Sequence, residues 1–264
     1  MDDGAGGMIE PGRGGPAPSG ERRRGIDRVL MLLDALLRQR APMRVGEIAR
    51  AIGAPRSTTY EIVHSLLQAE LLEFVGSEGH VYFGRAMHLY GWAYSHHNVH
   101  YRRIIEAMER MAVETGETVQ VCGLRGNKYI VIDCRDSPGP FRISSDVGVE
   151  VPIPWTASGR LLLSHMSEDE VRAFVPPEDF RLPGGRVPPV ADFLSDIARA
   201  RQQGFSETTG LADRFTWCMA APLRDAQGSI TRTLCFVIPA DTAEERRHVL
   251  LTLLLERARA LSLA

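Results

Sequence analysis

Lysine is almost missing from this chain of 264 residues: Lys128 is its only lysine, and arginine supplies the other thirty basic side chains. The net charge is only −2, so no global excess of positive charge marks a polybasic nucleic-acid binder. Any surface for nucleic acid must therefore be local. Residues 21–94 hold ten arginines against eight acidic residues, a net of +2, which permits DNA binding without establishing it.

Cysteines and long apolar runs are also few. The four cysteines form no CxxC pair and no Cys/His spacing of the kind that holds zinc. The longest apolar run, VLLTLLL at 249–255, is too short to cross a bilayer, and no apolar segment follows a basic stretch as in a secretory signal. We expect a reduced, cytoplasmic protein that makes no use of a membrane.

Motifs for catalysis and cofactors are lacking as well, because the chain has no GxSxG, P-loop or GxGxxG motif. Cys218 lies in an apolar stretch with no base nearby, so a small hydrophobic role is favoured over a nucleophilic one. His96 and His100 are spaced i, i+4, but no third metal ligand accompanies them. We therefore expect no metal, no cofactor and no enzymatic activity.

The first twenty residues contain seven glycines and three prolines and little apolar surface, so residues 1–20 are expected to be a disordered tail. The remaining length and a hydrophobic content of 44% are enough for two modest domains. We place the first at 21–84 and the second at 98–264, with a helical connector at 85–97.

Three helices are predicted in the first domain. Apolar residues recur at helical spacing in each of them: Ile26, Val29, Leu30, Leu33 and Leu37; Val45, Ile48, Ala49 and Ile52; Thr59, Ile62, Val63 and Leu66. Gly53 ends the second helix, and Pro55 suits the start of the third. The third helix then presents Ser57, Glu61, His64 and Gln68 on its opposite face. The segment GSEGHVYFG predicts a small hairpin after the helices.

This tight corner between two helices is typical of a helix-turn-helix, in which one helix braces a second that enters the DNA major groove. The stretch RSTTYE supplies short polar groups suited to phosphates and base edges. An ordinary three-helix bundle with a polar face is the alternative. The hairpin, which would form a wing, and the flanking arginines favour DNA binding.

The second domain interleaves strands and helices. TVQVCGL pairs with YIVIDC, and TWCMAAPL pairs with ITRTLCFVI, across turn-length gaps. FRISS and VEVPIP are expected to be extended, SEDE is a capping box, and TAEE is expected to cap a last helix from Thr242 to Leu261. An α+β fold with an antiparallel sheet flanked by helices follows.

Six segments together resemble the IclR family of bacterial transcription regulators from Arg24 to the end: GEIARAIGAPRSTTYEIVHSLL, GETVQVCGL, VPIPWTASGRLLL, ARARQQGFS, CMAAPLRDAQG and CFVIPA. The resemblance implies a winged helix-turn-helix, a linker helix and a GAF/PAS-like effector-binding domain. It also implies dimers or tetramers that bind pseudo-palindromic operators in double-stranded DNA, as a repressor or an activator.

Expected DNA contacts are Arg56, Ser57, Thr58 and Tyr60, with Arg44 on the backbone. Glu61 and His64 are candidate base readers. The family usually has a basic residue where this chain has Glu61; a carboxylate would be repelled by phosphates but could accept a hydrogen bond from cytosine N4. The alternative for Glu61 is a solvated helix residue.

By the same resemblance, a small carboxylate-like effector binds between the sheet and PWTASG, where the amides of Ala157 and Ser158 hold its carboxylate. Further pocket positions map onto Ile143, Val151, Cys218, Cys235 and Val237. The chain departs from small-oxoacid members at Thr208 and Thr209, which replace an acidic residue, and at Cys235 and Val237, which replace serines. Trp155 and Trp217 stand beside pocket positions, although core packing is the plainer role for both.

Fewer polar groups favour a larger, aromatic or otherwise hydrophobic carboxylate as the effector. Two rival functions remain open on the sequence. One is an enzyme that acts on the ligand of the second domain, whose turnover would depend on Cys218. The other is a winged helix that binds protein rather than DNA.

Overall fold

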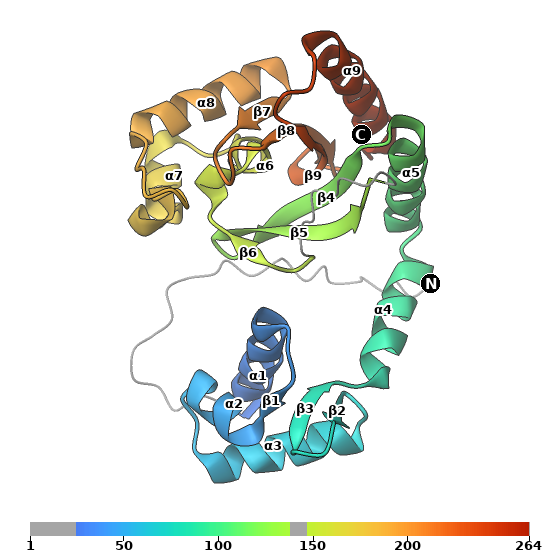
Figure 1. Cartoon of the computed structure of the whole chain (residues 1–264), viewed down its shortest axis with the longest axis vertical. Helices are drawn as coiled ribbons and strands as arrows, with labels where there is room; N and C mark the ends of the chain where they lie inside the picture. The colour runs from blue at the N-terminus through green and yellow to red at the C-terminus, as the bar shows by residue number, and fades with distance from the viewer. Residues whose placement is uncertain (1–24, 138–146, 264) are drawn as a thin grey trace, which may run out of the picture.

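The computed structural model describes residues 25–137 and 147–263. Two bodies are joined by one exposed helix, α4 (Arg85–His97), as Figure 1 shows. The predicted tail at 1–20 and the predicted strand FRISS lie outside the described residues.

The smaller body is a winged helix. It contains α1 (Gly25–Gln39), α2 (Val45–Ile52), α3 (Arg56–Gln68) and a three-stranded sheet of order β1-β3-β2, formed by β1 (Met43–Arg44), β2 (Leu72–Val75) and β3 (His80–Phe83). The apolar stripes of the helices meet in one core with the sheet, around Leu36, Ile48, Val63 and Val81. The predicted helices and hairpin are confirmed, and β1 adds a strand that the sequence did not predict.

The corner between α2 and α3 is built by Gly53. Its backbone has φ 63° and ψ 35°, the left-handed conformation that glycine adopts without a Cβ penalty. The amide of Ala54 donates to Ala49 O at 3.0 Å, which closes the end of α2. α3 can therefore start only three residues after α2 ends, and the angle between them is fixed.

The larger body contains a six-stranded antiparallel sheet of order β6-β5-β4-β9-β8-β7. Its strands are β4 (Thr118–Arg125), β5 (Lys128–Arg135), β6 (Glu150–Val151), β7 (Ser206–Thr209), β8 (Thr216–Arg224) and β9 (Ile230–Pro239). Both predicted strand pairs are present, as β4 with β5 and β8 with β9. The predicted α+β class is confirmed.

Two cores lie on the two faces of this sheet. One face packs against α5 (Val99–Thr115) and α9 (Glu244–Leu261), through side chains such as Met108, Phe236 and Leu254. The other face carries η1 (Ile153–Trp155), α6 (Ala157–Leu162), α7 (Glu168–Phe174), η2 (Pro177–Phe180) and α8 (Val190–Gln203). Figure 1 shows α5 and α9 on one side of the sheet and α7 and α8 on the other.

One capping prediction is confirmed and one is wrong. The Ser167 hydroxyl accepts from the Glu170 amide, and Glu170 accepts from the Ser167 amide at 2.8 Å, so SEDE is a capping box. Thr242 does not cap α9, which begins at Glu244 with Ala243 at the N-cap. Its hydroxyl donates instead to Pro239 O at 2.7 Å, within the turn that follows β9.

Candidate functional site

The outward face of α3 carries most of the predicted DNA-contact side chains. Thr59, Val63 and Leu66 are buried against the core, which leaves their neighbours on the opposite side of the helix. Arg56, Ser57, Tyr60, Glu61 and His64 are exposed, and Thr58 is half-buried. The helix periodicity therefore predicted correctly which face points to solvent.

A groove of about 600 Å³ lies between α2, α3 and the wing. It brings together Arg44, Arg56, Tyr60 and His64 from the predicted set. Ser57, Thr58 and Glu61 do not line it; they lie farther round the surface of α3. The groove is open and combines charged side chains with apolar ones such as Leu67 and Phe74.

Charge in the groove is mixed. Arg44 forms an ion pair with Glu78 of the wing, and its amide donates to the Glu47 carboxylate at 2.9 Å. Both side chains of the Arg44–Glu78 pair are more than half exposed, so the pair adds little stability. Its consequence is electrostatic, because Glu78 competes with any phosphate for Arg44.

Arg50 also lines the groove, although the sequence did not single it out. It follows Ile48 and Ala49 on α2, and its Nε donates to Gly46 O at 3.4 Å, back along the helix. The amphipathic pattern indicates only that Arg50 is exposed. The packing of α2 against α3 turns it toward the groove.

A second, more enclosed cavity of about 300 Å³ lies in the larger body, between the sheet and the segment 149–158. From the predicted effector set it includes Val151, Trp155, Ala157, Ser158, Cys218, Cys235 and Val237. Residues that the sequence did not predict complete the lining: Gln120, Tyr129, Val131, Val149, Thr156, Ala212, Asp213 and Thr216. The predicted member Ile143 lies outside the described residues.

Trp217 does not line this cavity, and its expected place there is corrected. Side chains alternate along β8, so Cys218 faces the cavity while Trp217 faces the opposite core. Its indole donates to Glu207 at 3.1 Å, and the Arg247 guanidinium lies 4.0 Å from the centre of its ring.

Thr208 is also outside the cavity lining. It pairs with Cys218 in the sheet, but it belongs to the edge strand β7. The side chains that border the cavity beyond Cys218 come instead from Ala212, Asp213 and Thr216. The expected replacement of an acidic residue at Thr208 and Thr209 therefore does not describe this wall.

The first turn of α6 forms one wall, and Gly159 makes its position possible. A Cβ on Gly159 would lie 2.5 Å from Ile153 O, closer than any side chain allows. The Gly159 amide donates to the hydroxyl of the N-cap Thr156 at 3.0 Å. Ala157 and Ser158 precede it in the first turn, where amides have no acceptor within the helix.

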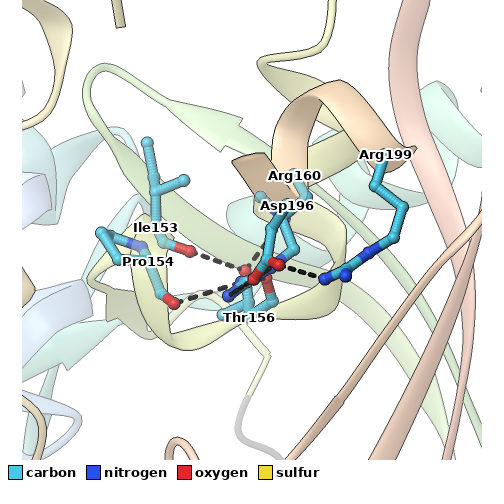
Figure 2. A network of polar contacts seen from close by, with 7 residues as sticks. Ile153, Pro154, Thr156, Arg160, Asp196 and Arg199 are labelled. Carbon is cyan, nitrogen blue, oxygen red and sulfur yellow. Dashed lines mark hydrogen bonds and ion pairs between the residues drawn. The ribbon is translucent and has the colours of Figure 1, made fainter. Parts of the chain in front are cut away.

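Arg160 holds this wall in place, as Figure 2 shows. Its buried guanidinium donates to Thr156 O at 2.8 Å and to Pro154 O at 3.2 Å. It also donates to Asp196 of α8 at 3.0 Å, and Asp196 pairs with Arg199. Burial lowers the pKa of Arg160, an effect that the Asp196 carboxylate opposes. The sequence contained this arginine in TASGRLLL but no signal for its role.

The sheet side of the cavity carries the thiols of Cys218 and Cys235, and Cys122 lies next to Cys235. Burial raises the pKa of Cys218 to about 12, so its thiol stays protonated near neutral pH. Burial also raises the pKa of Cys122, whose sulfur accepts from the Tyr129 hydroxyl at 2.9 Å. The Ser158 hydroxyl lies 3.0 Å from the Cys235 sulfur. Burial opposes ionisation of Cys235, but its hydrogen bonds with Cys122, Ser158 and Thr233 lower the pKa of this thiol. Together these groups form a weakly polar wall for a ligand.

His96 and His100 have other contacts. His96 stacks on Trp92 with ring centres 4.7 Å apart, and His100 Nε2 lies 2.6 Å from Leu261 O. Within residues 25–137 and 147–263, no cluster of three or more His, Cys, Asp or Glu side chains could hold a metal ion. No helix in that part of the chain is long and apolar enough to span a membrane.

Two family models match the chain. The IclR helix-turn-helix domain matches residues 25–76, and the bacterial transcriptional regulator IclR C-terminal domain matches residues 93–263. The HTH-type transcriptional repressor AllR of Salmonella typhi is 25% identical over 242 residues, which cover 85% of this chain and 83% of that protein.

Solved structures share the fold. An IclR transcriptional regulator from Alicyclobacillus acidocaldarius superposes with a TM-score of 0.82 at 19% identity, covering 92% of this chain and 98% of that one. An IclR homologue from Microbacterium hydrocarbonoxydans, complexed with 4-hydroxybenzoate, gives a TM-score of 0.76 at 21% identity, covering 90% and 98%.

Proposed function

Since the chain belongs to the IclR family of DNA-binding transcription regulators, which are not enzymes, we propose that an aromatic or hydrophobic carboxylate controls its affinity for a pseudo-palindromic operator. One observation carries the proposal. A groove lined by recognition-helix side chains and an enclosed ligand-sized cavity occur in the same chain, in two bodies that touch each other.

For DNA, Arg56, Ser57, Thr58 and Tyr60 would contact phosphates and base edges, and Arg44 would contact the backbone. Tyr60 is 57% exposed and free to turn toward a duplex. Glu61 and His64 would read bases, since both point outward from the middle of α3. Glu61 does not line the groove, where Arg44 and Arg50 would attract phosphates. Its carboxylate would instead accept a hydrogen bond from the edge of a cytosine.

For the effector, the size and lining of the second cavity support a small, largely apolar ligand. Val149, Val151, Trp155 and Val237 offer apolar surface to an aromatic ring. Its carboxylate would meet the amides of Ala157 and Ser158. The relative bound to 4-hydroxybenzoate is consistent with this chemistry.

For coupling, α1 touches the strand that borders the cavity. Arg38 lies 3.3 Å from Glu150, and Glu150 stands between Val149 and Val151, which both line the cavity. Asp34 pairs with Arg125, and a Cβ on Gly148 would lie 3.7 Å from Leu37. A ligand that shifts β6 would therefore shift α1 and, through the shared core, α3.

For assembly, α4 presents an apolar surface suited to a second copy of the chain. Leu89 and Trp92, one helical turn apart, are 62% and 57% exposed. A pseudo-palindromic operator needs two recognition helices held at a fixed spacing, and a paired linker helix would supply that spacing. Trp92→Glu should convert the oligomer to monomers in light scattering, whereas Tyr90→Glu, at an exposed residue on another side of α4, should not.

The deciding experiment is capture of genomic fragments by the full-length protein, followed by anisotropy titration of a recovered fragment with and without aromatic carboxylates. Salt-sensitive, sequence-specific binding is expected, with affinity that changes when the ligand is added. A winged helix that binds only protein would shift no fragment at any salt concentration.

A further inference from the structure

The Gln120 side chain is a buried amide at the edge of the effector cavity. It lies in the middle of β4, is 2% exposed, and belongs to the cavity lining. Among the described residues, its Nε2 is the one buried side-chain nitrogen or oxygen that has no hydrogen-bond partner. A buried amide donor without a partner destabilises a fold, so each such group calls for an explanation.

The polar groups around it already have partners. The Ser158 hydroxyl accepts from Thr233 at 2.9 Å. The Asp213 carboxylate accepts from the Phe215 amide and from the Thr216 hydroxyl. The Gln120 Oε1 lies 3.9 Å from the Cys122 thiol, which donates weakly toward it. Cys134, which pairs with Gln120 across the sheet, offers Nε2 only a sulfur, and sulfur is a weak acceptor. A charged oxygen of a ligand would be a stronger partner for this amide.

The position of Gln120 indicates which ligand group supplies this acceptor. Gln120 pairs across the sheet with Cys235, and the Cys235 sulfur contacts the Ser158 hydroxyl at 3.0 Å. Directly paired residues on one sheet face have Cβ atoms about 5 Å apart. The Gln120 side chain therefore starts beside Cys235, the residue that the Ser158 hydroxyl contacts at the first turn of α6.

We propose that Gln120 is a specificity-determining residue whose Nε2 donates a hydrogen bond to the effector carboxylate. This inference rests on the proposed function, because it assigns a partner to the carboxylate expected in this cavity. An uncharged aromatic of the same size would leave the amide unpaired and would bind more weakly.

Gln120→Met tests the proposal, since it keeps the length of the side chain and removes the donor. Calorimetry on the full-length protein should show benzoate and 4-hydroxybenzoate both binding about tenfold or more weakly, as expected for a lost hydrogen bond to a charged group. Without ligand, the midpoint of thermal unfolding should rise by about 2–4 °C, because no unpaired donor is buried. Gln202→Met, on the exposed surface of α8, is the matched control and should change neither value.

Gln120→Glu separates hydrogen-bond donation from shape. The introduced carboxylate should repel benzoate at neutral pH, and affinity should recover as the pH falls, because a protonated carboxyl donates again.

Four results would overturn the inference. In Gln120→Met, they are an unchanged affinity, a lowered unfolding midpoint, or an affinity loss confined to 4-hydroxybenzoate, which would place the amide at the hydroxyl of that ligand. In the wild type, it is the failure of both probes to bind. Failure of the proposed function would look different, since the wild type would then shift no operator fragment.

Discussion

The two recognition surfaces of this protein are opposite in character. The groove of the winged helix is open and lined by three arginines, one of which, Arg44, pairs with the wing carboxylate of Glu78. The effector cavity is half its volume, mostly apolar, and held by a buried arginine. Long-range electrostatic attraction can bring DNA to an open groove, where side chains then contact its bases and phosphates. A small molecule must instead lose its hydration shell and match the shape of an enclosed cavity. Substitutions should therefore damage the two surfaces by different routes.

The largest effect is expected for Arg160→Met. It removes a buried guanidinium that holds Pro154, Thr156 and Asp196, so the free energy of unfolding of the larger body should fall by about 2–3 kcal/mol. Urea unfolding measures this loss. Arg199→Met removes the exposed partner of the same Asp196 and should cost less than about 0.5 kcal/mol. Equal losses of unfolding free energy in the two variants would show that the burial of Arg160 does not make it more important to stability than Arg199.

Arg56→Ala should weaken operator binding by about 2 kcal/mol, roughly 30-fold, because it removes a charged donor at the start of α3. Anisotropy titration at several salt concentrations measures this loss and the change in salt slope. The affinity for benzoate should stay the same. Arg28→Ala, at a half-buried arginine of the winged helix that does not line the groove, is the control.

Trp155→Ala should lower the affinity for 4-hydroxybenzoate by about tenfold, since it removes the largest apolar side chain in the cavity lining. Its indole also donates to Asp179 O at 2.9 Å, so Trp155→Phe separates the lost hydrogen bond from the lost surface. Calorimetry gives both values. The same loss in Trp217→Ala would contradict the placement of Trp217 on the far face of the sheet.

Glu150→Gln should leave each surface intact and weaken the link between them. The Arg38–Glu150 pair is partly exposed, so the ratio of operator affinities with and without ligand should shrink by about two- to threefold. Anisotropy titration with and without benzoate measures this ratio. If the ratio stays at the wild-type value, α1 does not carry the coupling through this pair.

The smallest effect is expected for Glu78→Gln. It removes the carboxylate that competes with phosphate for Arg44, so operator affinity should rise by about twofold at low salt and return to the wild-type value at high salt. Glu73→Gln, a neighbouring wing carboxylate that does not line the groove, should raise affinity less. A fall in affinity would mean that Glu78 positions Arg44 rather than competing for it.

Sequence reasoning worked best where one local pattern decides the outcome. The stripe through Thr59, Val63 and Leu66 predicted which face of α3 is exposed, and Gly53 predicted the corner before it. It placed Trp217 beside the effector site because of its neighbour Cys218, but neighbours in a strand face opposite sides of the sheet. The structure agrees instead with the plainer alternative for Trp217, core packing.

By itself, the sequence determined the two-body plan and the outward face of the recognition helix, because helical and strand periodicities are local and survive without knowledge of neighbours. The family followed from the resemblance of six segments taken in order. Only the tertiary structure decided that Arg50 joins the groove, that Arg160 braces the cavity wall and that the Gln120 amide has no protein partner. These facts depend on segments far apart in the chain meeting in space. The pattern of one segment cannot predict which hydrogen-bond donors and acceptors find partners when distant segments pack together.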